Sequence, residues 1–516
     1  MEDDLASNVA DVLEIDRDEF QSRVQEEAEF IKEGIDDGVF DNPQGNVGLE
    51  IEFYAVTEEA HVPRWTEPAG EEERGSLARV PRRLLEYIGF EKELGLHNAE
   101  MSTTPQPLNE YGLETQECEV KSRLEAAREP LQTEGLDLVT DGIWTIPPHG
   151  ETAREYLTDS VIDDGVAIAT NMSESTRYHA MANTNQPANM EISTDYVHLS
   201  ADTVMPESLI TSIQPHYQLP TAMDLPQYFR YAVRIAGPIL AVGVNAPFFP
   251  PDLYDEDAAP TDILANSMQE NRITVFESVL NSENTDKIRF PSDINTVNEA
   301  VERIANDPVM VPMPITKGER FDDKFAHFRM KHGTFWRWIR PVFDGPTREA
   351  ANARIEFRPL PGQPTVQDII AFQALVAGVL VGLYRQEHPV KHLSWETAKD
   401  NFYNAAQNGI TADLTWITNA GEETGELDVI FEDILAHAAL GLESHGLSEA
   451  KANTYLDPIR TRVENRITPA KWKQNEVQKH LDDGKTLEEA IYAMQRNYFD
   501  KQKETLITGK FGDWLQ

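Results

Sequence analysis

Four short segments of the chain alternate between apolar and polar residues, which is the pattern of a β-strand with one buried face. They lie at 47–56, 97–104, 210–219 and 353–358. Apolar residues at helical spacing separate them, most clearly at 79–88 and 226–244. A further helix is expected after Thr365, because Thr365 with Asp368 three residues later is typical of a helix start. Strands separated by helices, with no tandem repeat, predict an α+β or mixed α/β fold.

The first of these strands carries two glutamates on one face. Leu49, Ile51 and Phe53 face one side, so Glu50 and Glu52 share the other. Two ionised carboxylates about 7 Å apart on one strand repel each other unless a cation or open solvent compensates. If this face lines a cleft, Mg²⁺ is the natural compensator, because hard divalent cations bind carboxylate oxygens.

The overall composition supplies a competing explanation for this pair. The chain has 89 Asp and Glu residues against 45 Lys and Arg residues, a formal charge of −44, so Glu-x-Glu recurs by chance. A solvated acidic face and a metal site therefore both remain open on this pattern alone. The acidic residues are spread along the whole chain, which indicates a protein kept soluble in high salt. The same charge disfavours nucleic-acid binding, since phosphate contacts need clustered Lys and Arg.

Carboxylates recur in and beside the other strands. Glu93 and Glu100 belong to the second segment, and Glu356 lies between two arginines on one face of the fourth. The polar face of the third strand consists of Gln214, His216 and Gln218. Singly, His216 is explained as a hydrogen-bonded core histidine and Glu356 as a buried ion pair. Together they predict a sheet whose polar side encloses Mg²⁺ ions and nucleotide phosphates.

Several classes of protein are disfavoured by simple features. The single cysteine, Cys118, excludes an internal disulfide and a cysteine-based zinc site. The N-terminus is acidic and has no apolar core, so no signal peptide is expected. The longest apolar stretch, 369–384, is shorter than a membrane span and contains Gln373. We therefore expect a soluble cytoplasmic protein that binds no membrane.

Taken in order, the motifs resemble those of the glutamate–cysteine ligases and related carboxylate–amine ligases, which share the glutamine synthetase catalytic fold. The run 48–53 is similar to the family's Gly-x-Glu-x-Glu-Phe strand, and Glu93 with Glu100 to its Glu-Leu-x5-Glu-x-x-Thr-Pro segment. Further matches are His216-Tyr217-Gln218, Asn245-Ala246-Pro247-Phe248, Trp336 with Arg340-Pro341, Ile355-Glu356-Phe357-Arg358, Gln363-Pro364-Thr365 and the helix from Asn401 to Gly409. Each motif is weak alone, but their order over about 45–410 is specific.

The resemblance implies an α+β fold with an antiparallel-rich curved sheet, a polar, metal-binding face and helices behind it. It implies an ATP-dependent ligase that phosphorylates a carboxylate, usually the γ-carboxyl of glutamate, and joins the acyl phosphate to an amine, with cysteine as the best guess. Another amine, or a degenerate relative that binds nucleotide without turnover, remains an alternative, and a homo-oligomer is left open. The Mg²⁺ ligands implied are Glu50, Glu52, Glu93, Glu100, His216 and Glu356.

Other roles follow from the same resemblance. Arg358, beside Glu356, would steady the transferring phosphoryl group, because its planar fork suits phosphate oxygens. Arg340, Arg272 and Arg177 are the candidates for the glutamate α-carboxylate. Gln218 and Thr104 are expected to contact substrate or nucleotide. The chain also departs from the family in two respects: Gln214 and Gln218 flank one histidine where many members have two, and Gln407 replaces a frequent arginine.

The resemblance also suggests a division of the chain into three parts. Residues 1–44 form an acidic, exposed helical extension, 45–390 the catalytic core, and 391–516 a helical C-terminal part of the same domain. Insertions are expected near 57–77 and 250–330. Polar, Pro-containing loops are predicted at 57–77 and 250–262, and a helix-and-loop segment at 150–200.

Overall fold

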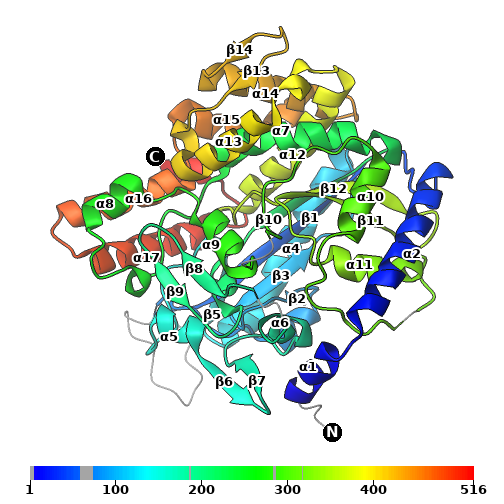
Figure 1. Cartoon of the computed structure of the whole chain (residues 1–516). Helices are drawn as coiled ribbons and strands as arrows, with labels where there is room; N and C mark the ends of the chain where they lie inside the picture. Colours follow the sequence, from blue (N-terminus) through cyan, green and yellow to red (C-terminus); the bar gives the residue numbers. More distant parts are fainter. Residues whose placement is uncertain (1–4, 59–73, 185–187, 283–285, 317, 516) are drawn as a thin grey trace.

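All four predicted strands exist and join one antiparallel sheet. A computed structural model describes residues 5–58, 74–184, 188–282, 286–316 and 318–515. The sheet has eight strands in the order β11-β12-β10-β1-β3-β2, with β4 and β5 also paired to β1, and it curls into a half-barrel (Figure 1). The strands are β1 (Asn46–Thr57), β2 (Glu91–Lys92), β3 (Asn98–Ser102), β4 (Gln106–Pro107), β5 (Leu136–Val139), β10 (Ile213–Gln218), β11 (Ile339–Asp344) and β12 (Asn352–Phe357). The prediction of an antiparallel-rich curved sheet is confirmed.

The two faces of the sheet differ as the alternation predicted. Leu49, Ile51 and Phe53 on β1 are buried in the core. On the opposite face Glu52 pairs in register with Glu100. Side chains that are opposite each other in an antiparallel sheet lie on the same face. The pairing of residues between neighbouring strands therefore places their polar side chains on one continuous surface. Strand β12 and its neighbours add further charged side chains to it.

Helices cover the apolar face of the sheet. They include α4 (Glu110–Thr133), α7 (Leu225–Gly243) and α12 (Val366–Arg385), while α13 (Trp395–Asn408) packs on α7. Thr365 caps α12 as predicted, since its side chain accepts a hydrogen bond from Asp368 N. Among the described residues, α12 is the one helix long and apolar enough to cross a membrane, yet 94% of its most apolar window is buried within the protein. It is therefore the central core helix.

The C-terminal part is helical but attached through buried charges. Its helices are α14 (Leu427–Glu443), α15 (Glu449–Asn465), α16 (Pro469–Asp482) and α17 (Leu487–Thr505). Arg462 binds Asp368 at 2.7 Å, and Lys473 donates to Asp141, with all four side chains buried. The prediction of helix throughout this part was wrong at one place, where β13 (Trp416–Ile417) and β14 (Glu423–Thr424) form a short hairpin.

The N-terminal extension is packed, contrary to the expectation that it is exposed. It contains α1 (Leu5–Leu13) and α2 (Arg17–Asp36). Figure 1 shows α2 lying against α10 (Val297–Ala305) and α11 (Ala326–His332), while α1 packs on α6 (Thr176–Ala182). Glu27 is buried and accepts hydrogen bonds from His327 Nδ1 and Phe328 N, which holds the start of α11. The apolar residues at helical spacing thus face a core.

Two other predicted segments contain more structure than expected. The region 150–200 holds two hairpins as well as helices, because its short alternating runs pair locally. Its elements are α5 (Ala153–Thr158), β6 (Ser160–Asp163), β7 (Val166–Ala169), α6, β8 (Glu191–Ser193) and β9 (His198–Ser200). The predicted loop 250–262 contains a 3₁₀ turn at Pro251–Leu253 and the start of α8 (Pro260–Asn266). Most of the loop predicted at 57–77 lies outside the described residues.

Two further helices complete the description. Helix α9 (Asn271–Leu280) lies between α8 and β11 in the chain, and the helix predicted at 79–88 is observed as the shorter α3 (Arg82–Glu86).

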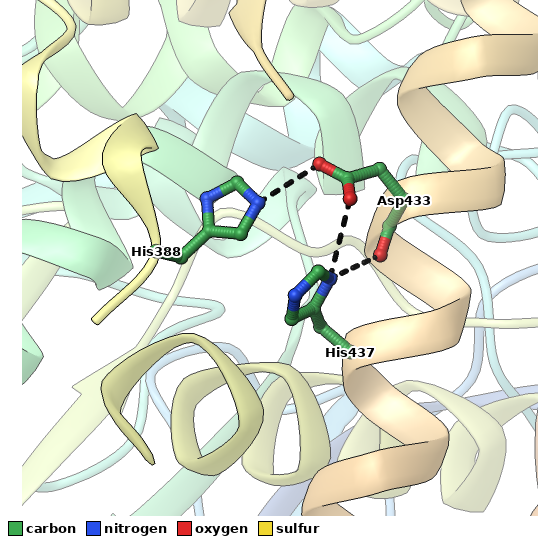
Figure 2. Close-up of side chains that lie close together, drawn as sticks. All are labelled: His388, Asp433 and His437. Atoms are coloured by element: carbon green, nitrogen blue, oxygen red, sulfur yellow. Dashed lines mark hydrogen bonds and ion pairs between the residues drawn. The ribbon is translucent and has the colours of Figure 1, made fainter. Parts of the chain in front are cut away.

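A partly buried carboxylate between two buried histidines joins the end of α12 to α14 (Figure 2). Asp433 receives bonds from His388 Nε2 at 3.0 Å and Trp416 Nε1 at 2.7 Å, and lies 3.3 Å from His437 Nδ1. His388 Nδ1 accepts from Val390 N, so the ring proton is on Nε2. A metal on Nε2 would move that proton to Nδ1, against the Val390 N–H. The cluster is therefore a hydrogen-bonded clamp.

Asp433→Asn should destabilise the protein by about 3 kcal/mol, because it leaves buried histidine and tryptophan donors without their charged acceptor. Burial opposes ionisation, but the bonds from both histidines hold the pKa of Asp433 well below its usual range. The stabilisation is thus complete above the unfolded-state pKa and lost as the pH falls towards the folded-state value. Chemical denaturation at several pH values checks both claims. Asp428→Asn on the same helix, where the side chain is 77% exposed, should change stability by less than about 0.5 kcal/mol. An equal effect of both substitutions would contradict the clamp.

Candidate functional site

Four glutamates meet on the polar face around β1 and β3. Glu50 and Glu52 extend from β1, Glu100 from β3, and Glu93 from the loop between β2 and β3. Glu52 accepts from Ser212 N at 2.6 Å, from Ser212 Oγ at 3.0 Å and from Gln214 Nε2 at 3.0 Å. The backbone at the start of β10 therefore fixes the orientation of one carboxylate and leaves the others to face it.

The carboxylates in this group have little positive charge to balance them. Burial, followed by repulsion from Glu50, Glu93 and Glu52, raises the pKa of Glu100 well above its usual range. Burial and repulsion from Glu93 raise the pKa of Glu52 to about 7. Burial also raises the pKa of Glu93. Like charges held this close favour either protonation or a bound cation.

The neighbouring part of the same face is balanced by arginines. Glu356 on β12 is 2% exposed and accepts from Arg340 Nε at 2.8 Å and from Arg358 Nη1. Burial opposes its ionisation, but Arg340 and then Arg358 hold the pKa of Glu356 well below its usual range. Glu50 lies 3.4 Å from His216 Nε2, and this histidine outweighs burial and lowers the pKa of Glu50. Glu50 and Glu356 are therefore the ionised members of the set.

Two hollows open on this polar face and share Glu50, Asp344 and Arg354. The larger, of about 410 Å³, is lined by Arg177, Arg340 and Glu356 as well. The smaller, of about 230 Å³, is lined by residues from β1, β10 and β12 and by the turn after β11. Its polar lining includes Asn46, Ser102, Thr103, His216, Gln218, Asp344 and Asn352. The face can therefore hold two small ligands on either side of the shared Glu50 and Asp344 carboxylates.

The residues present fit a hard divalent cation. One ligand atom from each of Glu50, His216 and Glu356 lies within 4.8 Å of the others. Carboxylate oxygens are the ligands that Mg²⁺ prefers, and unbalanced carboxylates beside this group supply more of them. The predicted metal residues are thus brought to one face.

The three arginines predicted to bind glutamate are placed differently. Arg177 lines the larger hollow, and its Nε and Nη2 are buried without hydrogen-bond partners among the described residues. Arg340 lines the same hollow but binds Glu356. Arg272 is 3% exposed, lies 3.3 Å from Glu270 Oε1 and donates to Pro359 O. Among the described residues, Arg177 is therefore the one of the three that lines the hollow without a carboxylate partner.

The other residues predicted to contact substrate or nucleotide also differ in whether they line a hollow. Gln218 lines the smaller hollow, and its Nε2 has no partner among the described side chains and backbone. Thr104 is exposed, and its hydroxyl donates to Glu119 at 3.0 Å, while Ser102 and Thr103 line the hollow instead. Gln407, at the position where relatives often carry arginine, donates to Asn266 O at 2.8 Å.

The profile of glutamate-cysteine ligase family 2 (GCS2) matches residues 46–494. The chain belongs to this family. That membership places the protein among the carboxylate–amine ligases and agrees with the order of motifs along its sequence. A comparison with curated protein sequences gave no match.

Solved structures with the same fold include a glutamate–cysteine ligase from Francisella tularensis in complex with AMP. It is 11% identical to this ligase, with a TM-score of 0.54, and 91% of each chain is covered. A bifunctional glutathione synthetase from Pasteurella multocida is 13% identical with a TM-score of 0.47, covering 92% of this ligase and 55% of that chain. At such identities the first likeness supports the fold of the ligase, including its curled sheet.

Sequence reasoning missed two side chains of the ligase site. Tyr178 donates to Glu93 Oε1 at 3.2 Å from helix α6. Burial and repulsion from Glu93 and Glu52 raise the pKa of Glu207, in the 3₁₀ turn Met205–Leu209, well above its usual range. Neither residue lies in an alternating strand, so the pattern that identified the other glutamates carried no signal for them.

Proposed function

We propose that this ligase uses ATP to join the γ-carboxyl of glutamate to an amine, with cysteine the best candidate, through an acyl-phosphate intermediate. The observation that carries the proposal is the acidic group around Glu52 and Glu100 directly beside the Glu356–arginine group on one concave face. Phosphoryl transfer needs this combination, because it depends on positioning and on neutralising phosphate charge. The AMP bound to the Francisella tularensis ligase supports a nucleotide substrate.

Mg²⁺ would be held by Glu50, Glu52, Glu93, Glu100, His216 and Glu356, and would supply positive charge to the phosphate oxygens of ATP. The protein's own contribution is orientation. Ser212 and Gln214 hold the Glu52 carboxylate, and Arg340 holds Glu356. Each carboxylate therefore meets its ligand already aligned.

Arg358 is placed to bind the transferring phosphoryl group. Its Nη1 is occupied by Glu356 and Gln214, but its Nε is buried without a partner among the described residues. A guanidinium fixed at one nitrogen can direct its remaining N–H groups at phosphate oxygens. In the proposed reaction the γ-phosphoryl group passes to the glutamate carboxylate, and the amine then attacks the acyl carbon and releases phosphate.

The larger hollow is proposed to bind glutamate, with Arg177 on its α-carboxylate. Arg177→Gln should raise the KM for glutamate about ten- to hundredfold, because it removes a charge-assisted hydrogen bond worth about 1.5–3 kcal/mol. The KM for ATP should change little in steady-state assays. Arg329→Gln is the matched control: Arg329 lines the same hollow, but Asp322 and Asp344 already bind it at 3.2 and 3.3 Å. A larger change of the KM for glutamate in Arg329→Gln would mean that Arg177 does not bind the α-carboxylate.

Phosphate release tests the proposed reaction. Purified protein in high KCl with ATP, Mg²⁺ and glutamate should release phosphate only when a suitable amine is added. A panel of amino acids with cysteine among them identifies the amine by rate. Release with another amine would change the substrate and keep the reaction. No release across the panel, with nucleotide still bound, would support the degenerate relative instead.

We further propose that the protein works in a salt-rich cytoplasm. Acidic residues outnumber basic ones about two to one along the chain, and they hold water when added salt screens their repulsion. Whether the ligase is a homo-oligomer is measured by light scattering under the same conditions.

A further inference from the structure

A third hollow, of about 350 Å³, lies on the other side of β11 from the candidate active site. Ile339 and Pro341 line it, while Arg340 between them lines the larger active-site hollow. Successive residues of a strand point to opposite faces, so the strand itself separates the two spaces. The third hollow is therefore distinct from the site described above.

Arg337 and Asp307 line this hollow, and the Asp307 carboxylate is shared with a second buried cation, Lys287, which lies outside the lining. Lys287 Nζ lies 2.5 Å from Asp307 Oδ2, and Arg337 Nη2 lies 2.7 Å from Asp307 Oδ1. The side chains of Lys287, Asp307 and Arg337 are 3%, 4% and 5% exposed. One positive charge therefore remains unbalanced in a region that water reaches poorly.

Two more arginines at the rim increase this positive charge. Arg303 is partly neutralised by Glu299, but Arg289 is exposed, and within the described residues its guanidinium donates to the backbone carbonyl of Asp286 alone. Burial lowers the pKa of Arg337, and both rim arginines lower it further against the opposing effect of Asp307. Such a concentration of cations is unexpected in a chain with a net charge of −44. It gives the hollow a local positive potential, which favours an anion.

The floor of the hollow is apolar. It is formed by Phe229, Ile294, Ala300, Phe335 and Ile339, all of them buried. A cavity of this volume suits a small organic molecule, and an apolar floor with a few charged groups at its rim is the usual design of such a site.

We propose that this hollow binds a small organic anion, a carboxylate or phosphate attached to an apolar group, with the anionic end bound by Arg289 and the apolar end against Phe229 and Phe335. Arg337 contributes positive charge, because its Nη1 and Nη2 already donate to Lys287 O, Trp336 O and Asp307. This binding is independent of the proposed ligase reaction. Among the described residues Arg289 donates through Nη1, so its Nε and Nη2 are available to a planar or tetrahedral anion.

Calorimetric titration of the full-length protein tests the site with three probes: phenyl phosphate, benzoate and neutral benzyl alcohol. We expect at least one anion to bind and the alcohol not to bind. Arg289→Glu should weaken anion binding at least about tenfold, because it places a like charge beside the ligand. Arg83→Glu is the matched control, since Arg83 is exposed on α3, which packs on β2 at the opposite end of the strand order from β11. It should leave binding unchanged.

The anion that binds more tightly shows whether the site prefers a phosphate or a carboxylate. Tighter binding of either one supports the site. Binding of neither anion overturns the proposal, as does equal weakening by both substitutions. Displacement of the bound probe by a non-hydrolysable ATP analogue would also overturn it, because the probe would then occupy the active site. Circular dichroism of both variants confirms that each is folded.

Discussion

Glu100→Gln should lower turnover at least about a hundredfold while making the metal-free protein more stable. Glu100 lies directly opposite Glu52 on β1 and Glu91 on β2. Like charges directly opposite each other in a sheet are destabilising. An amide of the same shape removes that repulsion, and with it a carboxylate proposed to bind Mg²⁺. Stability and activity should therefore move in opposite directions.

Thermal unfolding in chelator and in Mg²⁺, together with phosphate release, measures both effects. In chelator the wild type should unfold at a lower temperature than the variant, and adding Mg²⁺ should stabilise the wild type more. Glu423→Gln, at an exposed position on β14, is the control and should change neither quantity. A variant that is less stable in chelator would mean that Glu100 is held by an ion pair. Full activity would exclude it from the metal site.

The raised pKa values of these glutamates determine how the stability of the metal-free protein changes with pH. The folded-state pKa of Glu100 is raised by burial and by Glu50, and that of Glu52 is raised to about 7 by burial and Glu93. The folded metal-free protein thus binds more protons than the unfolded chain between the unfolded value, about 4.3, and the raised values. Its stability should fall as the pH rises through this window. The fall should be smaller in Glu100→Gln.

The strands of the polar face could be predicted because their information is local. Alternation at period two in β1 and β12 specifies both the strand and the side of each residue, and the face predicted for Glu50 and Glu52 is the face observed. Strand β11 was not predicted, because Pro341 and a run of apolar residues hide the alternation around Arg340. A proline is tolerated in this strand because β11 ends the strand order.

Burial against distant parts of the chain could not be predicted in this way. The helices of residues 5–36 are acidic enough to suggest solvent exposure, yet Val9, Val24 and Ile31 are fully buried. The surface that receives them is formed by α6, α10 and α11, at least 140 residues later. Likewise, Glu270 is close to Arg272 in sequence, but nothing in the sequence indicated that this guanidinium would also be buried and donate to Pro359 O, 87 residues later. Such partners are set by tertiary packing.

Arg358→Lys should lower kcat by about 10³-fold and leave the KM for ATP nearly unchanged, which is the effect expected of an arginine that acts mainly on the transferring phosphoryl group. Lysine keeps the positive charge beside Glu356, so the buried carboxylate stays paired and the fold should persist. It cannot, however, bind Glu356 and Gln214 at one nitrogen while directing others at phosphate oxygens, because its charge is on a single atom.

The split between kcat and KM separates this role from a structural one. If Arg358 served only to hold Glu356, lysine would preserve most of the activity, and Arg358→Gln, which removes the charge, would lower stability as much as turnover. If Arg358 bound ATP equally in the ground state, the KM for ATP would rise instead. Single-turnover phosphate release and thermal unfolding of both variants distinguish the three cases. Arg23→Lys, at an exposed arginine, is the control for the substitution itself. A loss confined to kcat in Arg358→Lys, with unfolding unchanged, is the result that assigns the phosphoryl group to this guanidinium.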